Sequence, residues 1–259
     1  MSARVFVLGV GVWMPGAPNL EAWLANRPQA ASVRPPAQLL PARMRGRASL
    51  LTAMFAEVAE QAARAARVEP GSLPSVFGSA YGEMGTTSSL LEQLRAAGAQ
   101  LSPAKFQASV HNTAAGQLSI ALRNPCFSTS LAAGHDTFAM SLLEACSWLA
   151  AHPGQLLLAC AEEAPSPILQ PTAAYPPLAA AFVLASHLPP DGHAVALASL
   201  SAPTPSAHTR EAARAADNPV APALRLVRAL FSGAQSNVHV NPASDFGYAV
   251  QIESYRRSP

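Results

Sequence analysis

The stretch from Asn124 to Gly134, with the apolar segment that follows it, constrains the fold more than any other part of this sequence. It predicts a β-strand, a sharp turn and a helix, and small residues at 132–134 allow the turn to be tight. Enzymes often carry a nucleophile at such a junction, because the helix N-terminus stabilises negative charge. The obvious nucleophile is missing here, and this absence is the main clue to function. Apolar positions all round the helix predict burial on every side, at Phe138, Leu142, Leu143, Cys146, Trp148 and Leu149.

Composition limits the classes of protein to which the chain can belong. Its 259 residues are 50% hydrophobic and 12% charged, enough to bury a substantial core in one large or two small domains. The net charge of +2 gives no strong field for nucleic acid. The cysteines at 126, 146 and 160 lie in apolar surroundings without metal-ligand or CxxC spacing. We therefore expect reduced core thiols, with no metal and no cofactor.

The N-terminus has some features of a secretion signal, because Arg4 is followed by the apolar run 5–12. That run is short, is interrupted by glycines and lacks an Ala-x-Ala site, so it predicts a buried first strand instead. None of the apolar runs, including this one, reaches the roughly 18 residues of a membrane span. We expect a cytoplasmic protein with no membrane partner.

The remaining segments alternate between strands and helices, which is typical of a layered α/β architecture. A glycine-rich loop at 81–85 lacks the GxxxxGK[ST] pattern of a phosphate-binding loop. The stretch 201–222 is rich in Ala, Pro, Ser and Thr and predicts an exposed linker with a short helix near 210–216. Helices are expected over 20–25, 49–62, 88–96, 112–122 and 223–231, and strands over 5–12, 75–80, 155–160, 179–185 and 195–200, with two closing strands around 242–244.

Short motifs also follow one another in a recognisable order. They are Arg4 to Gly16, Arg45-x-Arg47, Ser102-Pro103, Asn112-x-x-Ala115-Gly116, Asn124-Pro125-Cys126, Ser128 to Gly134, Ala159 to Glu162, Ala180 to Leu184 and Ser244 to Gly247. In these motifs the chain resembles the β-ketoacyl synthases, condensing enzymes of the thiolase fold, but is shorter. The resemblance implies an α/β, thiolase-like fold, layered α-β-α, with a truncated second half. It implies an N-terminal-like domain at 1–200, the linker 201–222 and a C-terminal remnant at 223–259.

The departures from this family bear on catalysis. The matched register places Leu131, at the expected start of the buried helix near Asn112 or Gly116, where the family has its nucleophilic cysteine. Leucine cannot form a thioester, and Cys126 matches a different, structural cysteine. The family's His-Gly-Thr-Gly-Thr and Gly-His motifs do not occur, and His239 in a late strand is expected to be structural. The resemblance therefore implies no catalytic residue.

Thiolase-fold subunits without the nucleophile are known as chain-length factors. They pair with an active ketosynthase and shape its acyl tunnel, and shortened versions accompany the synthases of aryl polyene and xanthomonadin-type pigments. The resemblance implies a non-condensing subunit that forms a heterodimer with a full-length β-ketoacyl synthase and meets the acyl carrier protein through that complex.

The same resemblance indicates which residues meet the partner. In related synthases the subunits pair through the strand before the elbow, here 126–130. The stretch between Ser-Pro and Asn-x-x-Ala-Gly, here 104–111, crosses the dimer and closes the neighbour's tunnel. The implied tunnel and interface residues are Ala104, Lys105, Phe106, Val110, Asn112, Gly116, Phe127 and Ser128.

Two alternatives belong to other classes. One is a stand-alone acyl-transferring enzyme that uses Cys126, or Ser128 with His135, as its nucleophile. His135 and Asp136 form a poor local pair, because adjacent helical residues point about 100° apart. The other is a homodimeric binding module without a partner enzyme. A neighbouring gene for a full ketosynthase would favour the heterodimer over both.

Overall fold

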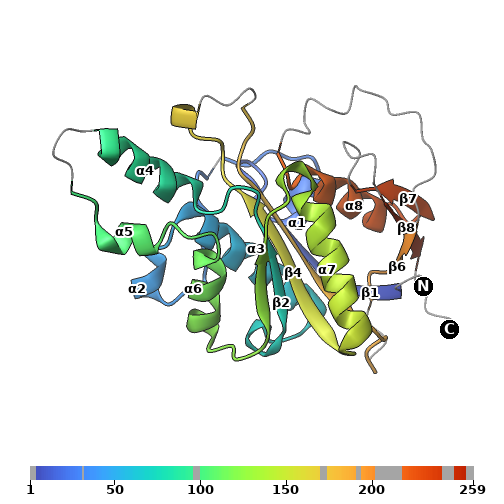
Figure 1. The fold of residues 1–259 in the computed structure, drawn as a ribbon. Helices are drawn as coiled ribbons and strands as arrows, with labels where there is room; N and C mark the ends of the chain where they lie inside the picture. The colour runs from blue at the N-terminus through green and yellow to red at the C-terminus, as the bar shows by residue number, and fades with distance from the viewer. Residues whose placement is uncertain are drawn as a thin grey trace.

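The computed structural model describes residues 4–30, 32–95, 100–169, 174–190, 194–201, 218–240 and 248–254. Within these ranges the chain forms an eight-stranded mixed sheet with the order β3-β2-β4-β5-β1-β6-β8-β7 (Figure 1). The strands are β1 (Arg4–Trp13), β2 (Ser75–Gly78), β3 (Ser128–Leu131), β4 (Gln155–Glu162), β5 (Leu178–Ala185), β6 (Ala196–Ser201), β7 (Ser236–His239) and β8 (Ala249–Ser254).

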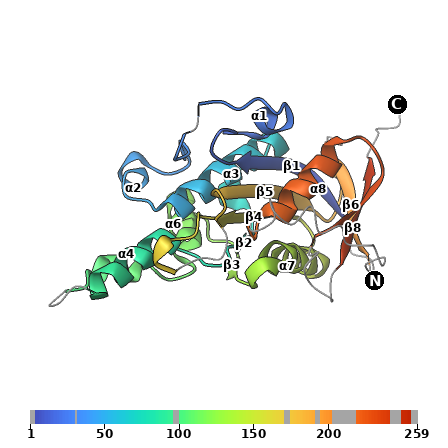
Figure 2. The same ribbon diagram turned by 90° about the horizontal axis from the view of Figure 1, so that it is seen from above.

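Helices pack against both faces of this sheet, as the view from above shows (Figure 2). Helices α7 and α8 pack on one face of the sheet, where they form an apolar cluster with the strand side chains that point to that face. Helices α3 and α6 form a second apolar cluster on the opposite face. None of the helices in the described ranges is long and apolar enough to cross a bilayer. The helices are α1 (Leu20–Leu24), α2 (Ala42–Arg45), α3 (Leu50–Ala66), α4 (Met84–Arg95), α5 (Pro103–Gln107), α6 (Thr113–Leu122), α7 (Thr137–Ala151) and α8 (Ala221–Phe231), with 3-10 turns η1 (Pro70–Ser72), η2 (Gly134–Asp136) and η3 (Pro167–Leu169).

The strand directions place three strand ends at one edge. β2 runs parallel to both β3 and β4, and Gly78 at its end pairs with Leu131 of β3 and Cys160 of β4. The other pairings are antiparallel, including β1 with β5 and β6. β5 is buried along its whole length, as its nearly unbroken apolar sequence predicts. The carboxyl ends of β2, β3 and β4 thus meet where the candidate site is expected.

Two glycines allow α3 to lie directly on the sheet. A Cβ atom at Gly9 would come within 2.2 Å of the carbonyl oxygen of Ala62, and one at Gly11 within 2.3 Å of that of Val58. No side chain fits at such distances. Ser49 caps the helix, because its hydroxyl accepts a hydrogen bond from the Thr52 N–H at 2.9 Å.

Most predicted elements are confirmed within a few residues, and the layered α-β-α architecture is confirmed. Two expectations about the fold are wrong. Helix α4 begins at Met84, within the predicted glycine-rich loop. Exposure was expected over 201–222, but Asn218 and Val220 are buried at its end. Residues 202–217, with the predicted short helix, and the turn at 242–244 lie outside the described residues.

Candidate functional site

The elbow begins where β3 ends. The carbonyl oxygen of Leu131 accepts a hydrogen bond from the Ser79 N–H at 3.1 Å, and α6 packs against the same strand. Between β3 and α7 lie two alanines and the 3-10 turn η2, so this turn is longer than the sequence predicts. Leu131 therefore lies at the end of the strand and not at the start of the buried helix, which corrects the expected position.

A threonine closes the elbow. The Thr137 hydroxyl accepts a hydrogen bond from the Ala133 N–H at 3.0 Å and donates one to the carbonyl of Gly134 at 2.7 Å. Gly134 has φ +56, a left-handed conformation that glycine adopts without strain. The backbone geometry of an elbow is thus present, while the residue at its strand end, Leu131, has no nucleophilic atom.

The structure does not bring the alternative nucleophiles to this elbow. Cys126 precedes β3, at the opposite end from Leu131 and about 15 Å away along a strand. Ser128 begins β3, where its hydroxyl accepts from Ser75 at 3.3 Å, whereas His135 follows the far end of that strand. Burial raises the pKa of the Cys146 and Cys160 thiols to about 12, so these thiols are poor nucleophiles.

Two further histidines lie in different parts of the molecule. His111 has a structural role: its Nε2 lies 2.7 Å from the carbonyl oxygen of Ser79, to which it donates. His239 lies on β7, at the opposite edge of the sheet from β3. It is therefore far from the elbow.

The open edge of the sheet beside β3 carries exposed apolar side chains. Ile120 of α6 is 72% exposed, and Phe127 just before β3 is 37% exposed. Phe127 stacks on Trp148 with ring centroids 3.8 Å apart, and Trp148 stacks on His152 at 3.9 Å. Leu143 of α7 is also exposed, so the expectation that this helix is buried on every side is wrong for the single chain. We call Ile120, Phe127, Leu143 and Trp148 the edge patch.

A second exposed feature is the arm, which we define as the helices α4 and α5, residues 84–95 and 103–107. The arm projects from the side of the molecule that also holds α2 and α6 (Figure 1). Ala104 and Lys105 of α5 are exposed, and Lys105 Nζ donates only to the Ser89 hydroxyl, at 3.1 Å, among the bonds described. Phe106 is 62% exposed, and Val110, Asn112 and Gly116 beyond the arm are exposed too. The predicted tunnel and interface residues are therefore all exposed: Ala104, Lys105 and Phe106 on the arm, Phe127 in the edge patch, and Val110, Asn112, Gly116 and Ser128 outside both surfaces.

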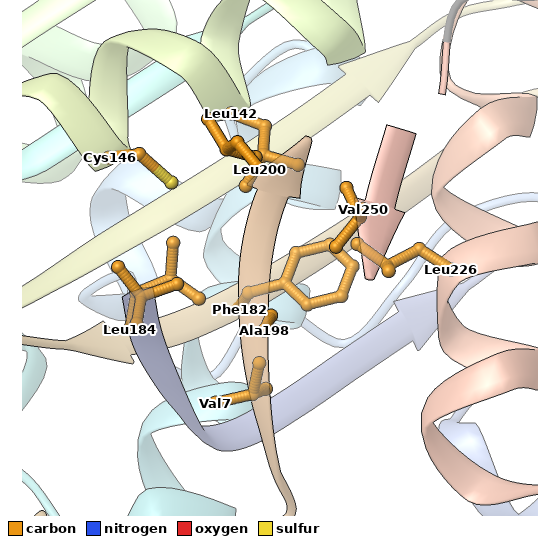
Figure 3. Close-up of a pocket in the computed structure, with 10 residues that line it drawn as sticks. Val7, Leu142, Cys146, Phe182, Leu184, Ala198, Leu200, Leu226 and Val250 are labelled. Carbon is orange, nitrogen blue, oxygen red and sulfur yellow. The ribbon is translucent and has the colours of Figure 1, made fainter. Parts of the chain in front are cut away.

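The interior offers little space for an acyl chain. One cavity among the described residues, between α7 and the sheet, has a volume of about 10 Å³ (Figure 3). Its lining side chains, including Cys146, Phe182 and Val250, point toward one another and leave room for about one water molecule. An open hollow of about 670 Å³ lies between α1 and α8, but no elbow residue lines it.

One feature at the carboxyl ends of the strands was not predicted from the sequence. Three glutamates, Glu83, Glu162 and Glu163, are buried beside the ends of β2 and β4. The signal available was Glu162-Glu163 directly after a buried apolar strand, where charged residues are unexpected unless they are paired.

Comparison with known proteins identifies the family. Residues 20–247 match the model of the β-ketoacyl synthase N-terminal domain. The chain therefore belongs to this family. A search of curated protein sequences found no match.

Solved structures show the same fold. The chain is similar to one in the ketosynthase (ApeO) complex with its chain length factor (ApeC) from Xenorhabdus doucetiae, with TM-score 0.70, 22% identity, and 96% of this chain and 99% of that chain covered. It is similar to a chain of AntDE:AntF, a type II polyketide synthase acyl-carrier protein in complex with its ketosynthase, with TM-score 0.75, 14% identity, and coverage of 97% and 99%. The PfaC keto synthase–chain length factor gives TM-score 0.60 and 12% identity, with 99% of this chain and 43% of that chain covered. The predicted thiolase-like fold is confirmed.

Proposed function

We propose that this protein is a non-condensing, ketosynthase-like subunit, a chain-length factor, which pairs with a full-length β-ketoacyl synthase and shapes the acyl tunnel of that partner. The observation that carries the proposal is a strand–turn–helix junction at which Leu131, the residue that the family resemblance aligns with the nucleophile, has no nucleophilic atom, beside an edge strand flanked by exposed apolar side chains. Without a nucleophile at this position the chain cannot form an acyl thioester there, and the exposed edge provides a surface for a partner.

The edge strand supports pairing. Among the described strands β3 has a sheet neighbour on one side only, so its other side is available to pair with a strand of another chain. The edge patch lies next to it and is rich in large apolar side chains, which are enriched at the centres of interfaces. Strand pairing would extend the sheet into the partner, and the patch would bury its apolar surface.

Incubation of the isolated protein with acyl carrier thioesters tests whether it can form an acyl-enzyme. We expect no acyl adduct on the isolated protein by intact-mass spectrometry, because Leu131 has no nucleophilic atom and Cys126 lies at the wrong end of β3. An active ketosynthase treated in parallel serves as the positive control. An acyl group on Cys126 or Ser128 would instead support a stand-alone acyl-transferring enzyme.

The tunnel role predicts an effect of bulk at the arm. Replacing the exposed Ala104 with tryptophan should shorten the product of the reconstituted pair by about one extension unit or more, because close-packed walls leave no slack for an added ring. Acylation of the partner should be unchanged. The matched control is Ala25→Trp, at the exposed end of α1. An unaltered product distribution in an assembled complex would show that the arm does not measure the chain.

Further parts of this proposal concern the setting of the reaction. We propose that the pair acts in polyene or fatty-acid-type biosynthesis in the cytoplasm, in the manner of the aryl polyene and xanthomonadin-type systems. The acyl carrier protein would meet this subunit through the complex. The similarity to chains of ketosynthase–chain length factor structures supports this setting. We also propose that residues 1–200 act as the main domain and that 223–259 is a remnant of the second half.

A further inference from the structure

The arm is attached to the sheet by two short segments that are tied to each other. The outgoing segment, residues 79–83, follows β2, and the returning segment ends at His111. The imidazole of His111 donates to the Ser79 carbonyl at 2.7 Å and lies against Gly82, where an added Cβ would be 3.0 Å from the ring. Gly82 itself has φ +64. The root of the arm is therefore a compact, specific structure.

Three buried glutamates connect this root to the rest of the protein. Glu162 accepts from the Ala80 N–H at 2.5 Å and from the Ser79 hydroxyl at 3.2 Å. Glu163 accepts from the Gly85 N–H at 2.7 Å, at the start of the arm, and from the Leu51 N–H at 2.9 Å, in α3.

The third glutamate comes from the outgoing segment itself. Glu83 accepts from the Ser49 hydroxyl at 2.9 Å, from Thr52 at 3.3 Å and from Thr86 at 3.3 Å. Together the three side chains bind the arm root to β4 and to the N-terminus of α3. We call Glu83, Glu162 and Glu163 the clamp.

The charges around the clamp do not balance if all three carboxyls are ionised. Arg34 is the cation that acts on Glu163, and its guanidinium also donates to the Ala48 and Ser49 carbonyls at 2.5 and 3.2 Å. Among the described residues, the buried thiol of Cys160 also faces Glu162, and His111 lies at the arm root, where it bonds the Ser79 carbonyl and not a carboxyl. One guanidinium cannot neutralise three buried carboxylates, and unpaired buried charge is costly.

The hydrogen bonds distinguish Glu163 from Glu162. Both oxygens of Glu163 accept N–H groups, which suits an ionised carboxylate. Glu162 Oε1 is buried and has no hydrogen-bond partner among the described residues. A negative charge is poorly supported there. Burial raises the pKa of Glu162 to about 7 and that of Glu83 to about 6, and the charge of Glu163 adds to both shifts.

We propose that Glu83, Glu162 and Glu163 form a proton-holding clamp that fixes the root of the α4–α5 arm, and that loss of its protons releases the arm from the sheet. The glutamates are positioning residues, since they act on the arm and not on a substrate. Any effect of the clamp on product length rests on the proposed function, because the arm matters for chain length only within the pair. The fixation of the arm itself does not rest on the proposed function.

The sign of the pH effect follows from linkage. The clamp binds more protons when closed than when open, so closure is favoured at low pH and weakened as pH rises through about 6 to 7. For Glu162 alone, the ratio of open to closed arm should rise about tenfold between pH 6 and pH 8.5.

Lys105 offers a direct readout, because it is the only lysine in the sequence and lies on the arm. Lys105 is exposed, but its backbone is held in α5, where the N–H groups of Phe106 and Ala108 donate to Ser102 and Ala104. A lysine-specific endoprotease should therefore cut the full chain there faster once the arm is released and α5 loosens. Cleavage rates are measured from pH 6 to 8.5 and divided by those of an unstructured peptide of residues 100–110. Wild type should show about a twentyfold rise, the product of about tenfold from Glu162 and about twofold from Glu83, and Glu162→Gln about twofold or less. Glu69→Gln, an exposed glutamate, should behave as wild type.

Two further measurements keep the test decisive. Far-UV circular dichroism should keep the signal of the sheet and of the helices outside the arm over this pH range, and loss of that signal would indicate global unfolding. If Glu162→Gln does not fold, hydrogen exchange of residues 84–95 in wild type decides. A pH-independent cleavage rate or exchange protection, or equal pH dependence in wild type and Glu162→Gln, overturns the proposal. These assays contain neither the partner ketosynthase nor an acyl carrier protein. A negative result would therefore overturn the clamp and leave the proposed function untouched.

Discussion

Replacing Phe127 with glutamate is expected to weaken binding of the partner ketosynthase by about 30-fold to 1,000-fold, equivalent to about 2–4 kcal/mol. Phe127 lies immediately before the edge strand, is 37% exposed and stacks on Trp148 with centroids 3.8 Å apart. Truncating an aromatic anchor at the centre of an interface already has a large effect. Glutamate would in addition place a charge where water is excluded.

The control for this change is Phe231→Glu. Phe231 ends α8, is 41% exposed and lies away from the β3 edge, so the same substitution there should leave the dissociation constant within about twofold. Calorimetry on purified partners gives both values, and circular dichroism shows that the variants are folded. Equal affinity for wild type and Phe127→Glu, both folded, would mean that the partner binds elsewhere.

The sequence predicts the sheet and most helices because their causes are local. α3 shows this most clearly: Ser49 provides the cap, and apolar residues recur along one face at helical spacing. β5 is an unbroken apolar run that is buried on both faces. Leu131 could also be placed near the elbow, because the motif around it is contiguous in the chain.

Features that depend on distant contacts could not be predicted. The glutamates of the clamp come from two segments about 80 residues apart, and only the fold brings them together. The partial exposure of α7 was missed because its sequence is apolar all round, and periodicity does not show whether a second chain covers a face. Asn218 looked like linker, yet its side chain donates to the Pro176 carbonyl at 3.0 Å, a contact 42 residues away.

The glycines of β1 have a related explanation. From the sequence, Gly9 and Gly11 served only as evidence against a secretion signal. In the structure they lie on the face of β1 that meets α3, where a Cβ atom would overlap the helix backbone. Gly116, which belongs to the family-like Asn-x-x-Ala-Gly motif, is the opposite case: an added Cβ would meet no atom within 4 Å. If Gly116 serves a contact, that contact lies outside the described part of this chain.

This contrast predicts that a glycine-to-alanine substitution has opposite effects on stability at positions 11 and 116. Gly11→Ala should lower the free energy of unfolding by about 3 kcal/mol or more, because a Cβ 2.3 Å from the Val58 carbonyl oxygen forces α3 away from the sheet. The melting temperature should fall by about 6–12 °C.

Gly116→Ala should instead raise the free energy of unfolding by about 0.5–1 kcal/mol, because alanine is the better helix former and the site is open. Thermal unfolding of the isolated chain measures both variants. Equal melting temperatures would refute the packing argument for β1 and α3. If Gly116→Ala is stabilised as expected yet binds the partner ketosynthase more weakly, the exposed face of α6 that carries Gly116 must lie against the partner, since the extra methyl group meets nothing within its own chain.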